Sequence, residues 1–234
     1  MKIVAANFKS NKTRLETLSY LRMLDFRLSF QKSNDNDAKS SLACKRNSKN
    51  SIYIFPSISS LAYDCFTNFT LGVQNAYPAV NGAYTGEMTL HQILEFDINT
   101  IMIGHVERQM FHESNEFLKM KFDFYKERGF SIFYCLHCER DNLDSLKEQI
   151  CNIDLNYKNL VLVYEPISSI GTGKPASKED VKKVVAYLKN IANVKVIYGG
   201  SVNYQNSKDI LEICDGVMVG NASLNLEEFI NIAK

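Results

Sequence analysis

Three side chains that together could move a proton beside a carbonyl group occur at separate points in the chain. Lys9 offers an ammonium, His105 an imidazole and Glu165 a carboxylate. Removing a carbon-bound proton next to a carbonyl requires an electrostatic stabiliser, an electrophile and a base, and these three groups can fill those roles. A lone carboxylate is more often an ion-pair or capping residue, so this interpretation depends on all three side chains meeting at one site.

Two glycine-bearing turns follow in the last quarter of the sequence. One is Gly199-Gly200-Ser201 and the other is Gly220-Asn221. Any one glycine is most simply a helix cap or a tight turn. Small residues in neighbouring turns also let backbone N–H groups come close to a phosphate, so the pair together favours a phosphate-binding site.

The segment directly after Glu165 has the composition of a lid. Its two ends are Pro166 and Pro175, and its centre reads Ile170, Gly171, Thr172, Gly173, Lys174. An ordinary surface loop could have this composition, but its place behind the candidate base favours a segment that closes over substrate and excludes water.

Eight short apolar runs punctuate the chain. They are continuous in hydrophobicity, as expected of parallel strands covered on both faces. The runs are 3–6, 51–55, 71–74, 101–104, 131–135, 160–164, 195–198 and 216–219.

Segments with helical spacing lie between these runs. The clearest are 15–30, 115–128, 177–190 and 203–213, and Ser177-x-x-Asp180 opens the third with a near-match to a capping box. Regular alternation of strand and helix requires right-handed crossovers and a parallel sheet. Eight units in 234 residues predict an α/β fold with one (β/α)8 barrel domain over residues 1–234. The polar stretch 31–50 is long for a connection; part of it, 38–44, could extend the first helix, and the rest is predicted to be an exposed loop.

Barrel enzymes carry their reacting groups at the carboxyl ends of the strands. Asn7 and Lys9 follow the first predicted strand, His105 and Glu107 the fourth, and Glu165 ends the sixth. The two glycine-bearing turns follow the seventh and eighth strands, where barrels commonly bind phosphate. The sequence therefore predicts one site with a reacting half and a phosphate half.

Composition and charge set limits on partners and location. Twenty-seven Lys and Arg against 26 Asp and Glu leave a formal charge of +1, which favours neither nucleic acid nor an anionic membrane. The apolar run 3–6 is too short for a signal-peptide core and no stretch has the length of a membrane span, so we expect a cytoplasmic protein.

Six cysteines are scattered through the chain and are predicted to be free thiols. Cys135 and Cys138 form a C-x-x-C, but it lies at the end of a strand-like run rather than at a helix N-terminus, and a second pair of metal ligands is missing. Redox or zinc chemistry is therefore the lesser alternative.

These residues resemble the triosephosphate isomerase family over nearly the whole chain. The most specific matches are Tyr164-Glu165-Pro166 with the 170–174 glycine segment, Tyr198-Gly199-Gly200-Ser201-Val202-Asn203, and Ile103-Gly104-His105 with Glu107-Arg108. The segments 6–11, 74–75, 82–87 and 215–220 match less specifically but in family order.

The resemblance implies a TIM barrel that interconverts dihydroxyacetone phosphate and glyceraldehyde 3-phosphate, in glycolysis and gluconeogenesis, without metal or organic cofactor. It implies that Glu165 is the base, that neutral His105 polarises the carbonyl and that Lys9, with Asn7 beside it, stabilises the enediolate. Gly171, Ser201, Gly220 and Asn221 would bind the phosphate. The family also forms homodimers, in which Thr85 of the 82–87 loop would reach a neighbouring subunit.

Several positions depart from the family pattern. Val106 replaces a Ser after the histidine, Phe8 a Trp before the lysine, Ser168 the Trp of the lid hinge, and Asn221 the second glycine of the last phosphate turn; Glu139 has no safe match. Two rival functions remain: another barrel enzyme for a phosphorylated metabolite, and a binding protein that keeps the fold without activity. The trio of Lys9, His105 and Glu165 argues against both.

Overall fold

The computed structural model describes residues 1–30, 50–111, 113–139 and 142–234. Eight parallel strands form a single sheet in this part of the chain. They are β1 (Lys2–Asn7), β2 (Asn50–Phe55), β3 (Thr70–Leu71), β4 (Thr100–Ile103), β5 (Ser131–Cys138), β6 (Leu160–Pro166), β7 (Lys195–Gly199) and β8 (Gly216–Val219).

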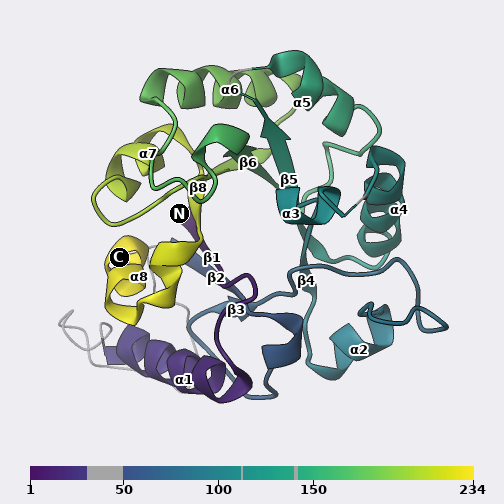
Figure 1. Cartoon of the computed structure of the whole chain (residues 1–234), viewed down its shortest axis with the longest axis vertical. Helices are drawn as coiled ribbons and strands as arrows, with labels where there is room; N and C mark the ends of the chain where they lie inside the picture. The colour runs from purple at the N-terminus through teal and green to yellow at the C-terminus, as the bar shows by residue number, and fades with distance from the viewer. Residues whose placement is uncertain (31–49, 112, 140–141) are drawn as a thin grey trace, which may run out of the picture.

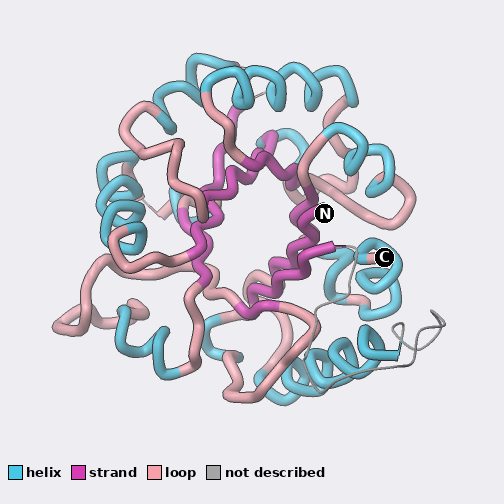
Figure 2. The backbone as a smooth tube through the Cα atoms, turned by 180° about the vertical axis from the view of Figure 1, so that it is seen from behind, coloured by secondary structure: helices cyan, strands magenta, loops and turns pink. Residues whose placement is uncertain are grey.

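The sheet closes on itself into a barrel. Its strand order is β3-β2-β1-β8-β7-β6-β5-β4, so β1 and β8 are neighbours and β3 and β4 are the two ends. Val73 joins those ends, because its N–H donates to Thr100 O (3.0 Å) and its carbonyl accepts from Met102 N–H (2.8 Å). Figure 2 shows the resulting ring of strands. The prediction of a (β/α)8 barrel is confirmed; a single domain over residues 1–234 stays a prediction.

Eight α-helices of the described chain surround the barrel (Figure 1). They are α1 (Arg14–Phe30), α2 (Leu90–Glu95), α3 (Val106–Gln109), α4 (Asn115–Lys126), α5 (Leu143–Ile150), α6 (Lys178–Ile191), α7 (Ser207–Ile213) and α8 (Leu226–Ala233). Short 3-10 turns cover Ile58–Ser60, Ile167–Ser169 and Asn221–Leu224. None of these helices is both long enough and apolar enough to cross a membrane.

Alternate residues along each strand serve two separate cores. One set points into the barrel and packs there: Ile3, Ala5, Phe55, Met102, Phe133, Cys135, Val161, Val163, Ile197 and Met218. The other set packs under the helices in a larger cluster that includes Cys138. Cys135 and Cys138 are three residues apart and therefore lie on opposite faces of β5, where both side chains are buried.

Two predicted elements are markedly shorter in the structure. The run 71–74 contributes only Leu71 to β3 and the bridge at Val73. The helix predicted from residue 203 begins at Ser207, because the Asn203 side chain accepts the N–H groups of Gln205 (3.0 Å) and Asn206 (3.1 Å) and forms a local turn instead. The segment 31–49, including the helix extension predicted at 38–44, lies outside the described residues.

Strand β5 is also longer than predicted, ending at Cys138 rather than Cys135. The side chain of Gln149, on α5, holds the added residues in place. Its Oε1 accepts the His137 N–H (3.1 Å) and its Nε2 donates to the His137 carbonyl (2.7 Å). This extension places His137 beside Glu165 in the strand register.

Candidate active site

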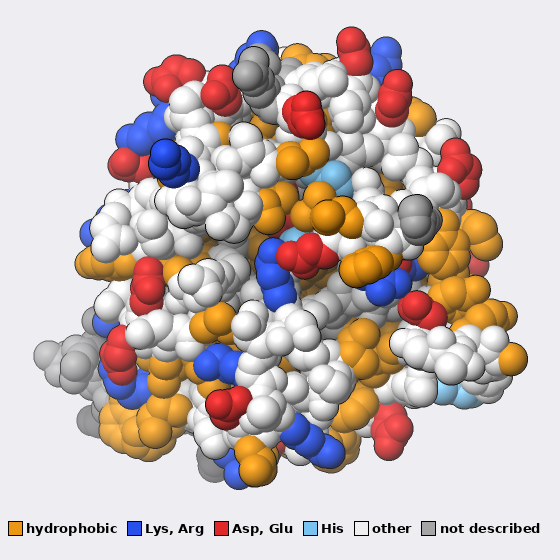
Figure 3. All heavy atoms as spheres, in the orientation of Figure 1, with side chains coloured by type: hydrophobic (Ala, Val, Ile, Leu, Met, Phe, Trp, Pro, Cys, Tyr) orange, Lys and Arg blue, Asp and Glu red, His pale blue; other side chains and the backbone are white. Residues whose placement is uncertain are grey.

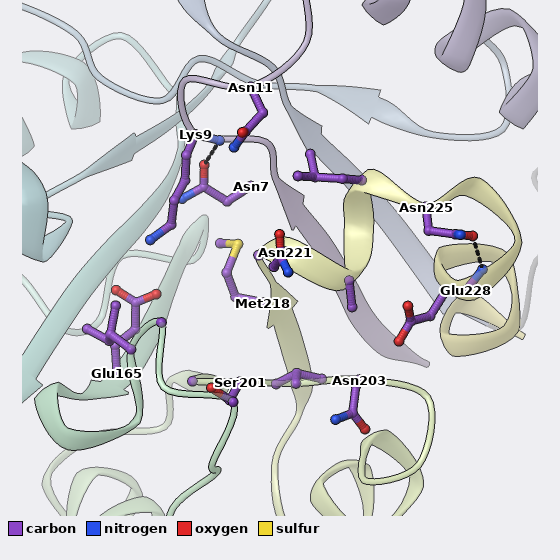
Figure 4. A pocket seen from close by; sticks show the side chains of 18 of the residues that line it. Asn7, Lys9, Asn11, Glu165, Ser201, Asn203, Met218, Asn221, Asn225 and Glu228 are labelled. Carbon is purple, nitrogen blue, oxygen red and sulfur yellow. Dashed lines mark hydrogen bonds between the residues drawn. The ribbon is translucent and has the colours of Figure 1, made fainter.

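A cavity of about 850 Å³ opens at the carboxyl ends of the strands. Figure 3 shows the hollow near the centre of this face, with basic and acidic side chains at its edge. The described chain lines the cavity with residues from both predicted halves of the site: Asn7, Lys9, His105, Glu165, Gly171, Ser201, Gly220 and Asn221. All the predicted catalytic and substrate-binding residues therefore meet at one site. Figure 4 shows Lys9 and Glu165 at one end of it and Ser201 and Asn221 further along.

The backbone conformation of Lys9, and the hydrogen bonds made to that backbone, hold this residue at the cavity. Its φ of +50° lies in the left-handed region, which is uncommon for a residue with a side chain. Asn7 Oδ1 accepts the Lys9 N–H at 3.0 Å, and Gln74 Nε2 donates to the Lys9 carbonyl at 2.9 Å. The Lys9 Nζ then reaches Glu107 Oε1 at 2.5 Å. Asn7 and Gln74 thus fix the backbone of Lys9 at the mouth, and Glu107 fixes its ammonium.

His105 caps a very short helix at the end of β4. Its Nδ1 accepts the Glu107 N–H at 3.4 Å, which favours the neutral ring with its proton on Nε2. The Nε2 lies 3.4 Å from Glu165 Oε2. Burial alone would lower the pKa of His105, but the carboxylates of Glu165 and Glu107 outweigh it and raise that pKa above its ordinary value.

Glu165 lies at the end of β6 with 5% of its surface exposed. Burial alone would raise the pKa of its carboxyl, but His105, Lys9 and His137 hold that pKa below its ordinary value. Gly199 on the adjacent strand makes room for it, because a Cβ there would lie 2.7 Å from Glu165 Oε1. The sequence predicted that Gly199 approaches a phosphate, but in the structure it provides space for the Glu165 side chain.

The residues predicted to bind phosphate line the same cavity. Gly200 has a φ of +141° and Ser201 a φ of +50°, so the turn after β7 is a sharp one. Gly220 comes close to the reacting half, since a Cβ there would lie 4.0 Å from Lys9 Cε. Asn221 opens the turn Asn221–Leu224 without a positive φ, so it causes no backbone strain where the family has glycine.

The predicted lid begins where β6 ends. Ile170 and Gly171 line the cavity, whereas Thr172 and Lys174 do not and are exposed. The lid rests on the turn after β7, because Ser201 Oγ donates to Ser169 O at 2.7 Å. At its other end, Tyr198 Oη accepts the Ala176 N–H at 2.9 Å. Ser168 is exposed and provides no large apolar anchor.

Two further residues give clear outcomes. Thr85, predicted at the dimer interface, is exposed in the 82–87 loop and does not line the cavity. Glu139, which had no match, is exposed just after β5. Among the described residues, no group of three or more His, Cys, Asp or Glu could hold a metal ion.

The predicted site list missed Glu107, Gln74 and His137. Glu107 follows the fourth predicted strand, and its place two residues beyond His105 is the available signal. Gln74 offered only its position near the end of the third predicted strand. His137 lies within the Cys135–Cys138 motif, and its position beside Glu165 depends on the added length of β5, which left no local signal.

Comparison with known proteins agrees with this geometry. The triosephosphate isomerase family model matches residues 2–234. A triosephosphate isomerase of Helicobacter acinonychis (strain Sheeba) is 44% identical, covering 97% of this chain and 96% of that protein. One from a Nitratiruptor species is 40% identical over 98% of this chain and 96% of its own. Another, of Helicobacter hepaticus, is 39% identical over 100% of this chain and 99% of its own. This chain belongs to the triosephosphate isomerase family.

Proposed function

We propose that this protein is an isomerase that interconverts dihydroxyacetone phosphate and D-glyceraldehyde 3-phosphate, acting in glycolysis and gluconeogenesis. The observation that carries the proposal is the meeting of Lys9, His105 and Glu165 in one cavity that the glycine turns also line. A three-carbon phosphate presents a carbonyl and an acidic C–H at one end and a dianion at the other. The two halves of the site match those two ends.

Glu165 is the proposed base. Because its pKa is held below the ordinary value, the carboxylate is ionised near neutral pH and can accept the carbon-bound proton. In the family, the division of roles between this glutamate and a neutral histidine is a well-known case of tuned acid–base chemistry. Glu165 then returns the proton to the neighbouring carbon. The exchange is complete once the hydroxyl proton has also passed from one enediolate oxygen to the other, so that carbonyl and hydroxyl change places.

His105 and Lys9 are proposed to stabilise the enediolate between the two transfers. The Nε2–H of a neutral His105 donates to the substrate oxygens as negative charge develops on them. This requires the substrate carbonyl to replace Glu165 at Nε2, where the carboxylate lies 3.4 Å away in the structure. Lys9 adds a full positive charge at the same end of the cavity, and Asn7 holds the Lys9 backbone.

The phosphate is proposed to bind at Gly171, Ser201, Gly220 and Asn221. Backbone N–H groups in such turns form a concave anion site without needing a positive net charge on the protein. The same turns touch the lid through Ser201 and Ser169. Closure of Pro166, Ile170, Gly171, Thr172, Gly173 and Lys174 over the substrate would exclude water, which keeps the enediolate from expelling its phosphate.

A homodimer is the proposed assembly. The 82–87 loop projects from the rim beside α2 (Figure 1), and Tyr84 and Thr85 on it are exposed. Tyr63, Met110 and Phe111 are each exposed by about three quarters of their surface, at 76%, 74% and 74%. Large exposed apolar side chains commonly mark a surface that another chain covers. Sedimentation at micromolar concentration should give twice the 26.7 kDa of one chain; a mass of 26.7 kDa would contradict the dimer.

The experiment that tests the function is a coupled assay with each triose phosphate in turn, without added metal or organic cofactor. Turnover in both directions supports the isomerase, whereas no turnover at high enzyme concentration removes it. Activity on other phosphorylated sugars at a higher kcat/KM would favour a different barrel enzyme. A location in the cytoplasm stays a prediction.

A further inference from the structure

His137 lies directly beside Glu165 at the mouth of the barrel. The two residues are partners in the register of β5 and β6. Two residues earlier, Cys135 and Val163 are also partners, and both point into the barrel. Because side chains alternate along a strand, His137 and Glu165 point to the same interior side, one layer closer to the substrate cavity.

The imidazole of His137 has no evident structural reason to be there. Only 6% of the residue is exposed, and neither ring nitrogen has a hydrogen-bond partner within the described part of the chain. A buried polar group without a partner is costly, so such groups usually find one in some functional state. The His137 backbone cannot move away easily, since Gln149 binds both its N–H and its carbonyl.

Glu165 has a carboxylate oxygen that lacks a hydrogen-bond donor among the described residues. Its Oε2 makes no well-formed hydrogen bond to the described residues and has only the His105 Nε2 at 3.4 Å. In the proposed function His105 must turn its Nε2–H to the substrate carbonyl, and Glu165 then loses that neighbour. The next residue after His105, Val106, brings an apolar side chain and no hydroxyl to this turn. A replacement donor must therefore come from another strand.

We propose that His137 is a positioning residue for Glu165, whose ring N–H donates to Oε2 when substrate occupies His105, so that the other carboxylate oxygen faces the substrate carbon. This inference rests on the proposed function and deepens it. The charged or titratable neighbours of the ring are Glu165 on β6 and His105 in the turn after β4. The neighbour on α5 is Gln149, which carries no charge. Burial lowers the pKa of His137, and His105 lowers it further, whereas Glu165 raises it. The net shift is downward, so the ring is a neutral donor at pH 7.

Two variants separate positioning from packing. His137→Leu keeps an apolar side chain of similar size but removes the donor, and His137→Gln keeps a donor that does not titrate. For His137→Leu we expect kcat to fall roughly tenfold, as for one lost hydrogen bond to a charged group, with little change in KM. The acid limb of kcat should move to higher pH, because Glu165 without its donor becomes more basic in the substrate complex. His137→Gln should restore kcat to within about threefold of the wild type.

Several results would overturn the inference. One is that His137→Leu has the same kcat and the same acid limb as the wild type. Another is that kcat of His137→Gln is as low as that of His137→Leu. Wild-type turnover is measured first, so loss of the proposed function is distinguished from loss of this inference alone. If His137→Leu fails to fold, the inference is tested by nitrogen-15 NMR spectra of the His137 imidazole in the wild type. Phosphoglycolate, a mimic of the intermediate, should shift the His137 ring N–H in the wild type and not in Glu165→Ala; the same shift in both proteins would contradict the contact.

Discussion

The Nζ of Lys9 lies 2.5 Å from Oε1 of Glu107, although 98 residues separate them in the chain. The pair joins the loop after β1 to the turn after β4 across the mouth of the barrel. Glu107 also stands beside His105, with its Oε2 3.3 Å from the ring Nδ1. One carboxylate therefore orients both groups that we propose to stabilise the enediolate.

Replacing Glu107 should impair turnover without touching Glu165. For Glu107→Gln we expect kcat to fall about tenfold, the effect of losing roughly 1.4 kcal/mol of transition-state stabilisation when Lys9 is held less firmly. Glu227→Gln is a matched control, because it removes the same charge from an exposed pair with Arg27. Steady-state kinetics of both variants provide the check. Unchanged kcat in Glu107→Gln would show that the pair is only a surface contact.

The acid limb of kcat/KM, which reports ionisations of the free enzyme, should report His105 rather than Glu165. The active form needs a neutral His105 and an ionised Glu165. The pKa of His105 is raised above its ordinary value of about 6.5, so the first proton added as the pH falls enters this ring and activity drops. The pKa of Glu165 lies below its ordinary value, so this carboxyl stays ionised throughout that window.

Glu107→Gln tests directly whether the pKa of His105 sets the acid limb. It removes one of the carboxylates that raise the pKa of His105, so the acid limb of kcat/KM should move to lower pH. Movement to higher pH, or no movement, would mean that another group controls the limb.

The lid should become protected when the site is filled. Gly171 and Gly173 have φ angles of +70° and +74°, and no atom lies within 4 Å of where a Cβ would be at either position. These open surroundings suit cleavage of the free protein by a protease of broad specificity such as subtilisin. Phosphoglycolate should slow cleavage within 166–175 and leave cleavage at the exposed turn near Cys151 unchanged as an internal control. Equal protection at both places, or at neither, would contradict closure.

A buried ion pair beneath the site should be important for stability. Lys121 is fully buried and its Nζ lies 2.7 Å from both Glu113 Oε1 and Asn75 Oδ1. Lys121→Met leaves Arg108 as the one charged partner of the buried Glu113 carboxylate among the described residues, and we expect it to lower the free energy of unfolding by about 3 to 5 kcal/mol. Lys119→Met, which breaks an exposed pair with Asp123 on the same helix, should cost less than about 1 kcal/mol. Urea unfolding followed by circular dichroism measures both; equal losses would contradict the account.

The sequence predicted the positions of the strands well, and with them the meeting of the reacting side chains. Continuous apolar runs mark buried parallel strands, and a closed barrel brings the residue after each run to the same rim. Lys9, His105 and Glu165 could be assigned to one site for that reason alone. The lid, inferred from the prolines and glycines after Glu165, stays a prediction.

Other features depend on contacts between distant residues and left no local signal. The space that Gly199 provides for Glu165 follows from the alignment of β6 with β7. The extension of β5 to Cys138 depends on the side chain of Gln149, on the helix that follows that strand, and it decides where His137 lies. The late start of α7 depends on side-chain hydrogen bonds of Asn203 that compete with the helix.

The central claim is that Glu165 carries a substrate proton through an enediolate held by Lys9 and His105. Isomerisation of dihydroxyacetone phosphate in D₂O tests it most directly, because a proton held on a carboxyl group can exchange with solvent. We predict solvent deuterium at C2 of the glyceraldehyde 3-phosphate formed, and a rate about 10² to 10⁴ lower in Glu165→Gln. Product without any solvent deuterium, or an undiminished rate in Glu165→Gln, would contradict the account.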